Sequence, residues 1–431
     1  MKVLFKGGYV ANARPDLSGK MDVLIVDDRI AQLAKDINIS DCKVINIEGK
    51  TLLPGLIDVH CHLRDPGYEY KENIATGTRS AAMGGFTTIA CMANTQPVAD
   101  NRAVIDYIKK KVKAEGVVKV MPIGSITKNL EGKELSLMGE MKEAGIIAVS
   151  DDGKTVMDGH LMLKAMEYAS NFDLPVICHC EDASIARDGV VNMGYISTIT
   201  GLRGISRVAE DAIVARDLML AGETGAHVHI AHVSTAGSVE LIKTAKDKGI
   251  RVTCETAPHY FSLTEKAVEN FDTFAKVNPP LRTEEDVQAI KQALKDGIID
   301  IIATDHAPHH LDEKLVEFDL AAFGISGLET ALALGVTELV ESGVMDIHGL
   351  VDKMSYTPAR IFKLPGGIIQ EDTPADIVVV DLKKSYEIDA DKFVSLGKNT
   401  PFNGKKVKGK VEYTMVSGQL VVSRGVLGGN K

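Results

Sequence analysis

The chain has 431 residues, of which 45% are hydrophobic and 25% are charged, a composition typical of a globular protein and not of a disordered one. Its 49 basic and 59 acidic residues give a net charge of −10, and the basic residues form no long runs, so we expect no binding to nucleic acid or to an anionic membrane. No run of about 18 apolar residues and no signal-peptide pattern is present, so we expect a cytoplasmic protein.

Both ends of the chain show short β-strand patterns. Apolar runs separated by Gly and Asp occupy residues 3–5, 23–26 and 44–47 near the N-terminus, and residues 375–381, 411–416 and 418–422 near the C-terminus. Because chain termini often lie close together, we predict one small β domain formed by residues 1–51 and 366–431.

The middle of the chain, residues 52–365, alternates short apolar strands with helical patterns. Strands are predicted to begin near Leu52, Phe86, Val117, Gly145, Leu174, Ala226, Arg251 and Ile298. Helical patterns lie between them, for instance at 101–115, 158–171, 207–221 and 284–296. Eight strand–helix units predict an α/β fold, a (β/α)8 TIM-type barrel. An open doubly wound sheet is the alternative, but no GxGxxG motif follows the first strand.

Histidines and aspartates follow several of the predicted strands, at the end where a barrel carries its catalytic groups. His60 and His62 end the first strand and share a face, because strand side chains alternate. Other strands end at Asp151 and Asp152, His179, His232 and Asp305. Imidazole and carboxylate together are the ligands of a catalytic zinc site, and their number predicts two bridged ions.

Several nearby residues leave alternatives open. Asp151 and Asp152 are adjacent, so only one of them can face the barrel mouth. His227 and His229 share a face and are expected in the core or in a hydrogen-bond network. Cys61 lies beside a predicted ligand but alternates away from it, as does Cys180. The six cysteines form no CxxC pair, which favours buried, reduced thiols.

The remaining polar residues at these strand ends suggest how a substrate is held. Asp305 is placed to accept a proton from water and to return it to a leaving nitrogen, which predicts metal-assisted amide hydrolysis. Arg64 suits a bidentate grip on a carboxylate, and a structural salt bridge is its alternative role. Asn94 and Asn278 suit an amide-containing ring, and His309 suits the same anion as Arg64. Residues 309–327 are predicted to form a mobile lid.

Three segments resemble the amidohydrolase superfamily and, within it, the dihydroorotase family. They are residues 58–66 (DVHCHLRDP), residues 303–309 (ATDHAPH) with Lys314, and residues 85–95, from GFTT to ANT. Cys61 departs from this pattern, in which the position is usually aliphatic. The resemblance implies zinc ligands at His60, His62, His179 and His232, a bridging Asp152 in place of a carboxylated lysine, and Asp305 as ligand and general base. Lys154 as the bridge would instead resemble a hydantoinase.

The resemblance also implies a substrate and a reaction. Arg64, Asn94 and His309 would hold a carboxylate, and Asn278 with the backbone at Phe323 and Gly324 would meet a ring. The implied reaction is the reversible, zinc-dependent cyclisation of N-carbamoyl-L-aspartate to (S)-dihydroorotate and water, in pyrimidine (UMP) biosynthesis. The alternatives are another cyclic amidohydrolase (allantoinase, or dihydropyrimidinase/hydantoinase) and a non-catalytic scaffold homologue. A homodimer is expected, and association with aspartate transcarbamoylase, as in some relatives, stays open.

Overall fold

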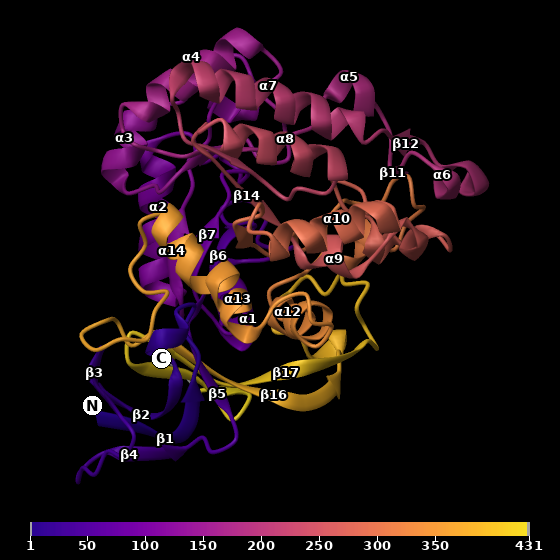
Figure 1. Ribbon diagram of the computed structural model, residues 1–431. Helices are drawn as coiled ribbons and strands as arrows, with labels where there is room; N and C mark the ends of the chain where they lie inside the picture. The colour runs from indigo at the N-terminus through magenta and orange to yellow at the C-terminus, as the bar shows by residue number, and fades with distance from the viewer. Residues whose placement is uncertain (1, 429–431) are drawn as a thin grey trace.

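The computed structural model describes residues 2–428, which form a barrel of parallel strands covered by helices and, beside it, a sheet that contains both termini (Figure 1). In Figure 1 the N-terminal strands and the C-terminal strands lie side by side below the barrel. No helix among these residues is long and apolar enough to cross a membrane.

The eight parallel strands of the barrel match the eight predicted ones. They are β6 (Leu56–Cys61), β7 (Phe86–Cys91), β8 (Lys119–Pro122), β9 (Val149–Ser150), β10 (Val176–Cys178), β13 (Val228–Ile230), β14 (Val252–Thr256) and β15 (Ile301–Ile302). They pair as two arcs, β6–β7–β8 and β9–β10–β13–β14–β15. Parallel bridges between Gly124 and Val149 and between Cys61 and His306 join the arcs at both seams, so the barrel is closed.

At least one helix follows each barrel strand, and one longer helix can be assigned to each of them. These helices are α1 (Ile74–Met83), α2 (Arg102–Glu115), α3 (Met138–Ala144), α4 (Gly159–Ser170), α7 (Val208–Thr224), α8 (Ala236–Asp247), α10 (Glu284–Lys295) and α12 (Ala331–Gly335). Their limits follow capping signals in the sequence. Asn101 accepts hydrogen bonds from the first N–H groups of α2, and Gly225 ends α7 at a φ of 69°, which glycine adopts without strain.

Shorter helical segments lie in the loops and after the last barrel strand. The α-helical ones are α5 (Ala183–Ala186), α6 (Tyr195–Thr200), α9 (Pro258–Ser262), α11 (Leu311–Lys314), α13 (Ile347–Val351) and α14 (Thr357–Ile361). Single turns form η1 (Pro15–Leu17), η2 (Lys128–Leu130), η3 (Glu265–Val268), η4 (Thr273–Ala275) and η7 (Ala390–Lys392), and η5 (Val336–Val340) and η6 (Asp352–Tyr356) are π-helical.

The terminal sheet has nine strands drawn from both ends of the chain. They are β1 (Lys2–Val10), β2 (Gly19–Val26), β3 (Arg29–Ala34), β4 (Lys43–Asn46), β5 (Thr51–Pro54), β16 (Ile377–Glu387), β17 (Lys406–Val416), β18 (Gln419–Ser423) and β19 (Val426–Leu427). The N-terminal and C-terminal strands meet where β5 pairs with β16, and β5 also pairs with β1. The sheet is therefore one structure built from both termini.

The first barrel strand begins later than the sequence pattern indicates. The apolar run from Leu52 contains two strands, β5 in the terminal sheet and β6 in the barrel, with Gly55 between them. A Cβ at Gly55 would lie 2.2 Å from the Thr87 hydroxyl oxygen, so only glycine fits where the chain passes from the sheet to the barrel. The predicted domains are the β domain, residues 1–51 and 366–431, and the barrel, residues 52–365. We propose that the boundary predicted between residues 51 and 52 lies instead at Gly55. Met1 and residues 429–431 lie outside the described residues.

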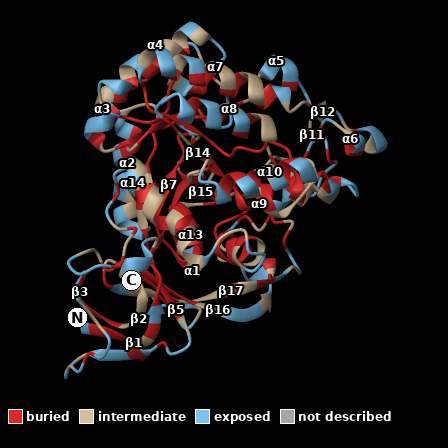
Figure 2. Cartoon of the chain, viewed as in Figure 1, coloured by how far each residue is buried: buried red, intermediate tan, exposed pale blue. Residues whose placement is uncertain are grey.

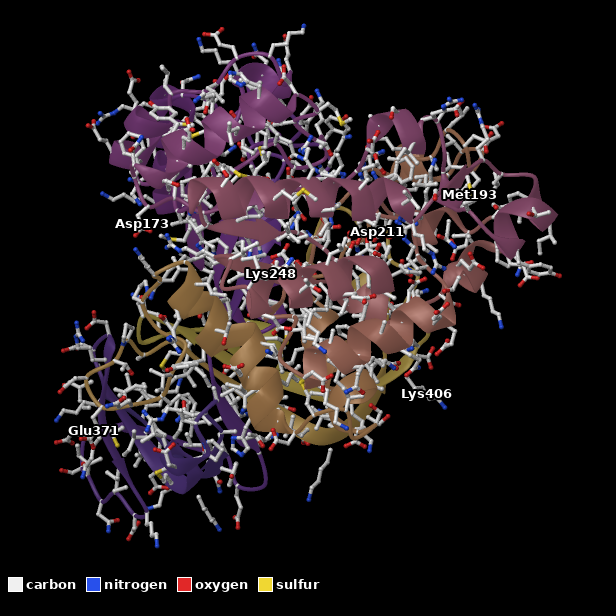
Figure 3. All side chains as sticks on the ribbon, turned by 45° about the horizontal axis from the view of Figure 1, so that its top comes forward. Asp173, Met193, Asp211, Lys248, Glu371 and Lys406 are labelled. Atoms are coloured by element: carbon white, nitrogen blue, oxygen red, sulfur yellow. The ribbon has the colours of Figure 1, made fainter. Side chains whose placement is uncertain are left out.

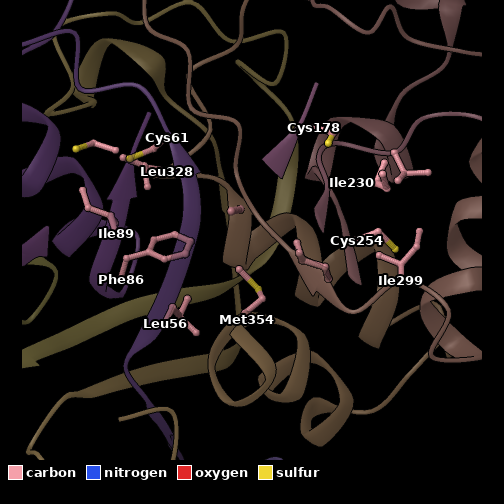
Figure 4. Close-up of a cluster of buried hydrophobic side chains, with 14 of the residues drawn as sticks. Leu56, Cys61, Phe86, Ile89, Cys178, Ile230, Cys254, Ile299, Leu328 and Met354 are labelled. Carbon is pink, nitrogen blue, oxygen red and sulfur yellow. The ribbon is translucent and has the colours of Figure 1, made fainter. Parts of the chain in front are cut away.

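Apolar side chains form two layers, one inside the barrel and one between its strands and the helices. The inner layer includes Ile57, Val59, Met92 and Ile177, and Phe362 packs against it. Figure 2 shows that the strands are buried while the outer faces of the helices are exposed. Figure 4 shows members of the outer layer from opposite arcs, Leu56 and Phe86 on one side and Cys178 and Cys254 on the other.

Two connections of the barrel are long, those after its fifth and seventh strands. Between β10 and α7 the chain forms α5, α6 and the two-stranded ribbon β11 (Val191–Asn192) and β12 (Gly204–Ile205), which projects from the barrel. Met193, at this projecting end, is 58% exposed and lies far from Glu371 beside the terminal sheet (Figure 3). The loop after β14 contains α9, η3 and η4.

Candidate metal centre and substrate cavity

Four histidines and two aspartates meet at the carboxyl ends of the barrel strands. His60 Nε2 lies 3.3 Å from Asp152 Oδ1 and 3.5 Å from Asp305 Oδ1, and His62 Nε2 lies 3.4 Å and 3.3 Å from oxygens of the same two carboxylates. His179 Nδ1 and His232 Nε2 lie 3.6 Å and 3.5 Å from Asp152 Oδ1. The structure thus brings all six predicted ligands into one buried cluster.

The two adjacent aspartates after β9 have different surroundings. Asp152 faces the four histidines, whereas Asp151 accepts hydrogen bonds from the N–H groups of Ile126 (2.8 Å) and Thr127 (3.0 Å) and from the Thr127 hydroxyl. Asp151 therefore holds the loop after β8, whereas Asp152 is the aspartate that lies among the candidate ligands. Lys154, the alternative bridge, is exposed.

The cluster fits divalent metal ions of the zinc class. One atom from each of His60, Asp152 and His232 lies within 4.8 Å of the others, and the same holds for His60, His62 and Asp305. His60 Nε2 and Asp152 Oδ1 are buried and have no hydrogen-bond partner among the described residues. Buried polar atoms are normally paired, so the lack of a hydrogen-bond partner indicates that these two atoms are free to coordinate a metal ion.

Burial and the neighbouring imidazoles shift the pKa values of the two carboxylates in opposite directions. Burial by itself would raise the pKa of Asp152, but the imidazoles of His60, His179 and His232 hold it well below its usual range. The pKa of Asp305 is lowered in the same way, against burial, by His62, His60 and His232. Both carboxylates are thus ionised at neutral pH, as metal ligands must be.

A buried carboxylate that the sequence analysis missed, Glu255 on β14, orients His60. His60 Nδ1–H donates to Glu255 Oε1 at 2.5 Å, which leaves the Nε2 lone pair free to bind a metal. His229 Nε2–H donates to Glu255 Oε2 at 3.2 Å, and the Thr253 hydroxyl joins His229 Nδ1 (2.8 Å) to His227 Nε2 (2.9 Å). This explains the inward-facing His227 and His229 as members of a hydrogen-bond network.

Replacing Glu255 with glutamine is expected to weaken metal binding by roughly 10–100-fold, the usual cost of losing a carboxylate that orients a histidine ligand. The amide keeps the volume but no longer accepts a charge-assisted hydrogen bond from His60. Competition with a chromophoric chelator would measure the affinity. Thr253→Val, which breaks the same network two links away, is the control. Equal affinities for Glu255→Gln and the unmodified protein would contradict the orienting role.

The backbone at this end of the barrel is constrained by hydrogen bonds and by unusual dihedral angles. Asp58 on β6 accepts from the N–H (2.9 Å) and the hydroxyl (2.6 Å) of Thr304, which fixes the residue before Asp305. His232, Asp305 and Arg64 have positive φ angles of 33°, 45° and 61°. Non-glycine residues adopt this region at an energetic cost and cluster at functional sites, and here the bend turns each side chain towards the same cavity.

Beside the cluster lies a cavity of about 220 Å³ that includes every predicted substrate residue. Its lining contains Arg64, Asn94, Asn278, His309, Phe323 and Gly324, together with five of the six candidate ligands. Asn94 Oδ1 accepts from His62 Nδ1–H at 2.9 Å and so orients that ligand as well. A larger cavity of about 330 Å³, between Glu329 and Tyr386 against the terminal sheet, contains none of these residues.

The far wall of the cavity is positively charged. Arg64 Nη2 lies 3.4 Å from His309 Nε2, and His309 Nε2–H donates to the Phe323 carbonyl at 2.8 Å. Burial, followed by the charges of Arg64, Lys71 and Lys314, holds the pKa of His309 well below its usual range. Asn278 Oδ1 is buried and finds no hydrogen-bond partner within residues 2–428. Such a wall suits an anionic ligand that also carries an amide.

Cys61 and Cys180, which lie beside predicted ligands in the sequence, take no part in the cluster. Cys61 Sγ lies 3.2 Å from the Ala90 carbonyl and Cys180 Sγ lies 3.7 Å from the Cys178 carbonyl, so both face the layer between strands and helices. Burial raises the pKa of each thiol, which disfavours the thiolate that a metal would need.

This combination of a (β/α)8 barrel, an attached β-sheet and a His–Asp cluster at the strand ends defines a metal-dependent amidohydrolase. A family profile described as Dihydro-orotase-like matches residues 49–238. Over 99% of the chain, the sequence is 55% identical to a dihydroorotase of Acetivibrio thermocellus and 52% identical to one of Ruminiclostridium cellulolyticum, covering the whole of each relative. The chain belongs to the dihydroorotase family.

Solved structures of related enzymes share the whole architecture. The L-hydantoinase (dihydropyrimidinase) of Arthrobacter aurescens is 26% identical, with a TM-score of 0.89 over 99% of this chain and 97% of its own. The dihydropyrimidinase of Brevibacillus agri is 25% identical, with a TM-score of 0.88 over 99% of this chain and 96% of its own. The barrel and the terminal sheet are therefore a common scaffold, and substrate choice depends on the residues of the cavity.

Proposed function

We propose that this protein catalyses the reversible cyclisation of N-carbamoyl-L-aspartate to (S)-dihydroorotate and water, the dihydroorotase step of pyrimidine biosynthesis. The observation that carries the proposal is the position of Arg64 and His309 in the same cavity as the six-residue His–Asp cluster. The cluster suits hydrolysis of a ring amide, and the cationic wall suits the carboxylate that distinguishes dihydroorotate from dihydrouracil.

For the metal we propose two Zn²⁺ ions, held by His60, His62, His179, His232, Asp305 and a bridging Asp152. Such ions supply Lewis acidity that polarises a carbonyl oxygen and lowers the pKa of water. His60 and His62 would present their Nε2 atoms to the ions, because Glu255 and Asn94 accept from the Nδ1–H groups of these two histidines.

Asp305 performs the proton transfers in this proposal. In the hydrolytic direction its carboxylate takes a proton from the attacking water as the new C–O bond forms. It then delivers that proton to the ring nitrogen as the amide C–N bond breaks. Its lowered pKa keeps the carboxylate ionised and so able to accept a proton, and the side chain lines the cavity proposed to hold the ring.

Arg64 and His309 hold the substrate carboxylate, while Asn278 and the Phe323–Gly324 backbone meet the ring. In the free enzyme His309 is neutral, because burial and neighbouring cations depress its pKa. A carboxylate bound against Arg64 opposes those charges and raises the pKa of His309, which favours a protonated ring that donates to the anion.

Replacing Arg64 with alanine is expected to raise KM for dihydroorotate by roughly 10–100-fold, as expected for a lost charge-assisted hydrogen bond to an anion. The value of kcat should change much less, because Arg64 holds a group that does not react. Steady-state kinetics on metal-replete enzyme would measure both. Arg102→Ala, on the exposed face of α2, is the control. An unchanged KM would assign Arg64 a purely structural role.

The test of the function is hydrolysis of (S)-dihydroorotate by the metal-loaded protein, with dihydrouracil and allantoin assayed in parallel. Turnover of dihydroorotate alone is expected. Turnover of a neutral ring would retain the metal chemistry and replace the substrate with that of another cyclic amidohydrolase. Absence of turnover on all three, with zinc shown to be bound, would favour a scaffold role.

We further propose that the protein acts in the cytoplasm as a homodimer. The six cysteines are unpaired and five of them are buried, as expected in a reducing compartment. Light scattering at micromolar concentration would measure the mass of the assembly. A mixture with aspartate transcarbamoylase would show, by a further rise in mass, whether the pathway enzyme binds.

A further inference from the structure

Two lysines beside the cavity are buried without a carboxylate partner. Lys276 is 1% exposed and Lys314 is 0% exposed, and neither forms an ion pair with a described residue. Burying an ammonium group away from a counter-charge is costly unless its N–H groups are satisfied. Burial lowers the pKa of Lys276 to about 8 and that of Lys314 to about 7. We therefore expect both lysines to have a structural or functional role.

The partners of both ammonium groups are backbone carbonyls, four of them in the loop after β15. Lys276 Nζ donates to Phe318 O (2.7 Å) and Asp319 O (3.0 Å). Lys314 Nζ donates to Ala322 O (2.7 Å), Gly324 O (3.2 Å) and the carbonyl of Lys276 itself (3.3 Å). Two side chains thus donate to five carbonyls, and those of Phe318, Asp319 and Ala322 have no other hydrogen-bond donor within residues 2–428.

These contacts join two walls of the substrate cavity. Lys276 directly precedes Val277 and Asn278, which line the cavity from the β14 side, while Phe323 and Gly324 line it from the β15 side. The Gly324 N–H donates to the Lys276 carbonyl at 2.9 Å. The Lys276 ammonium also lies 4.5 Å from the centre of the Phe323 ring, within range of a cation–π contact. Both lysines therefore act where the two walls meet.

We propose that Lys276 and Lys314 are positioning residues for the substrate, which clamp residues 318–324 against residues 276–278 and so fix the wall that meets the ring. The Phe323 carbonyl, which accepts from His309 Nε2–H, lies between the Ala322 and Gly324 carbonyls that Lys314 contacts. The inference rests on the proposed function in assigning the cavity to dihydroorotate. It also differs from the mobile lid predicted for residues 309–327, since the two lysines would hold in place the part of that loop that reaches the cavity.

A third residue also donates hydrogen bonds to this loop. Loss of one lysine should therefore loosen the loop without unfolding the barrel. Asn399 Nδ2 donates to Gly324 O at 2.9 Å and to Ala307 O at 3.1 Å, and it approaches from the terminal-sheet side. Residues 318–322, in contrast, receive the side-chain contacts of the two lysines. We therefore expect the effect of each lysine to be largest between Phe318 and Phe323.

The experiment compares Lys276→Met and Lys314→Met with Lys266→Met, an exposed lysine of the same β14 loop. Methionine fills the volume but leaves the carbonyls unpaired. Hydrogen exchange by mass spectrometry should show at least about tenfold faster exchange at residues 315–324 in the two clamp variants only. Their KM for dihydroorotate should rise at least about tenfold, with metal content unchanged and kcat affected less.

The proposal would be overturned if loop exchange or KM in the clamp variants equalled that of Lys266→Met. A lower melting temperature with unchanged KM and loop exchange would overturn it as well. Should a methionine variant fail to fold, Lys314→Gln, which keeps an N–H donor without the charge, is measured against the same criteria. Loop exchange does not depend on the substrate. A wild-type protein that fails to turn over dihydroorotate would therefore refute the proposed function and still leave the clamp itself to be judged by exchange.

Discussion

Replacement of Asp305 by alanine is expected to lower kcat by at least about 10³-fold while the barrel stays folded, since a positioned general acid–base residue contributes roughly 10²–10⁴-fold and Asp305 is also a candidate metal ligand. Its carboxylate lies 3.3 Å from His62 Nε2 and 3.5 Å from His60 Nε2 and faces the cavity. No other carboxylate in the lining except Asp152 is available to take the proton. Turnover of dihydroorotate at saturating substrate would measure the loss.

The control for this variant is Asp300→Asn, at the opposite end of the same strand. Asp300 pairs with Lys246 at 2.6 Å and accepts from the Cys254 N–H, so it holds structure and does not reach the cavity. It should lose stability and keep its activity. Metal content must be determined for both variants, because a loss of metal would mask the loss of the base. Retained turnover in metal-replete Asp305→Ala would remove Asp305 from the proton-transfer role.

The strand ends of the barrel could be predicted from the sequence, because the pattern there is local. Each ligand follows a short apolar run, and strand alternation alone places His60 and His62 on one face. The observed limits of β7, β10 and β13 agree with those runs, as does the convergence of six side chains at one end. The error at Leu52 arose because one continuous apolar run serves two sheets, and only pairing with β1 and β16 separates them.

The residues that support the site could not be predicted in the same way, because their roles depend on partners far away in the sequence. Glu255 orients a histidine 195 positions earlier, and nothing in the run from Val252 to Thr256 indicates that partner. Polar residues at alternate positions, Thr253 and Glu255, were the available signal. Lys276 has no distinguishing signal in the sequence and Lys314 only belongs to a resembling segment, and only the folded loop shows that both donate to backbone carbonyls.

The sequence also leaves open whether Asp151 or Asp152 faces the cluster. The second prediction with a large expected effect concerns this pair. Asp152→Asn should reduce bound metal to a small fraction of the wild-type content and lower turnover by at least about 10³-fold. The two oxygens of Asp152 approach His60, His62, His179 and His232 within 3.6 Å, so this carboxylate offers negative charge to every part of the cluster. A neutral amide of the same shape supplies one acceptor oxygen and no charge.

Asp151→Asn is the matched control, since it makes the same chemical change one residue away. The Asp151 side chain binds N–H groups of Ile126 and Thr127, outside the metal cluster, and an amide oxygen can still accept from them. This variant should keep its metal and its turnover and lose about 1–2 kcal/mol of stability, as expected when a charged acceptor becomes neutral. Metal analysis after dialysis, activity and thermal unfolding would separate the two. If Asp151→Asn lost the metal and Asp152→Asn retained it, the bridging role would pass to the other aspartate and the ligand set would have to be redrawn.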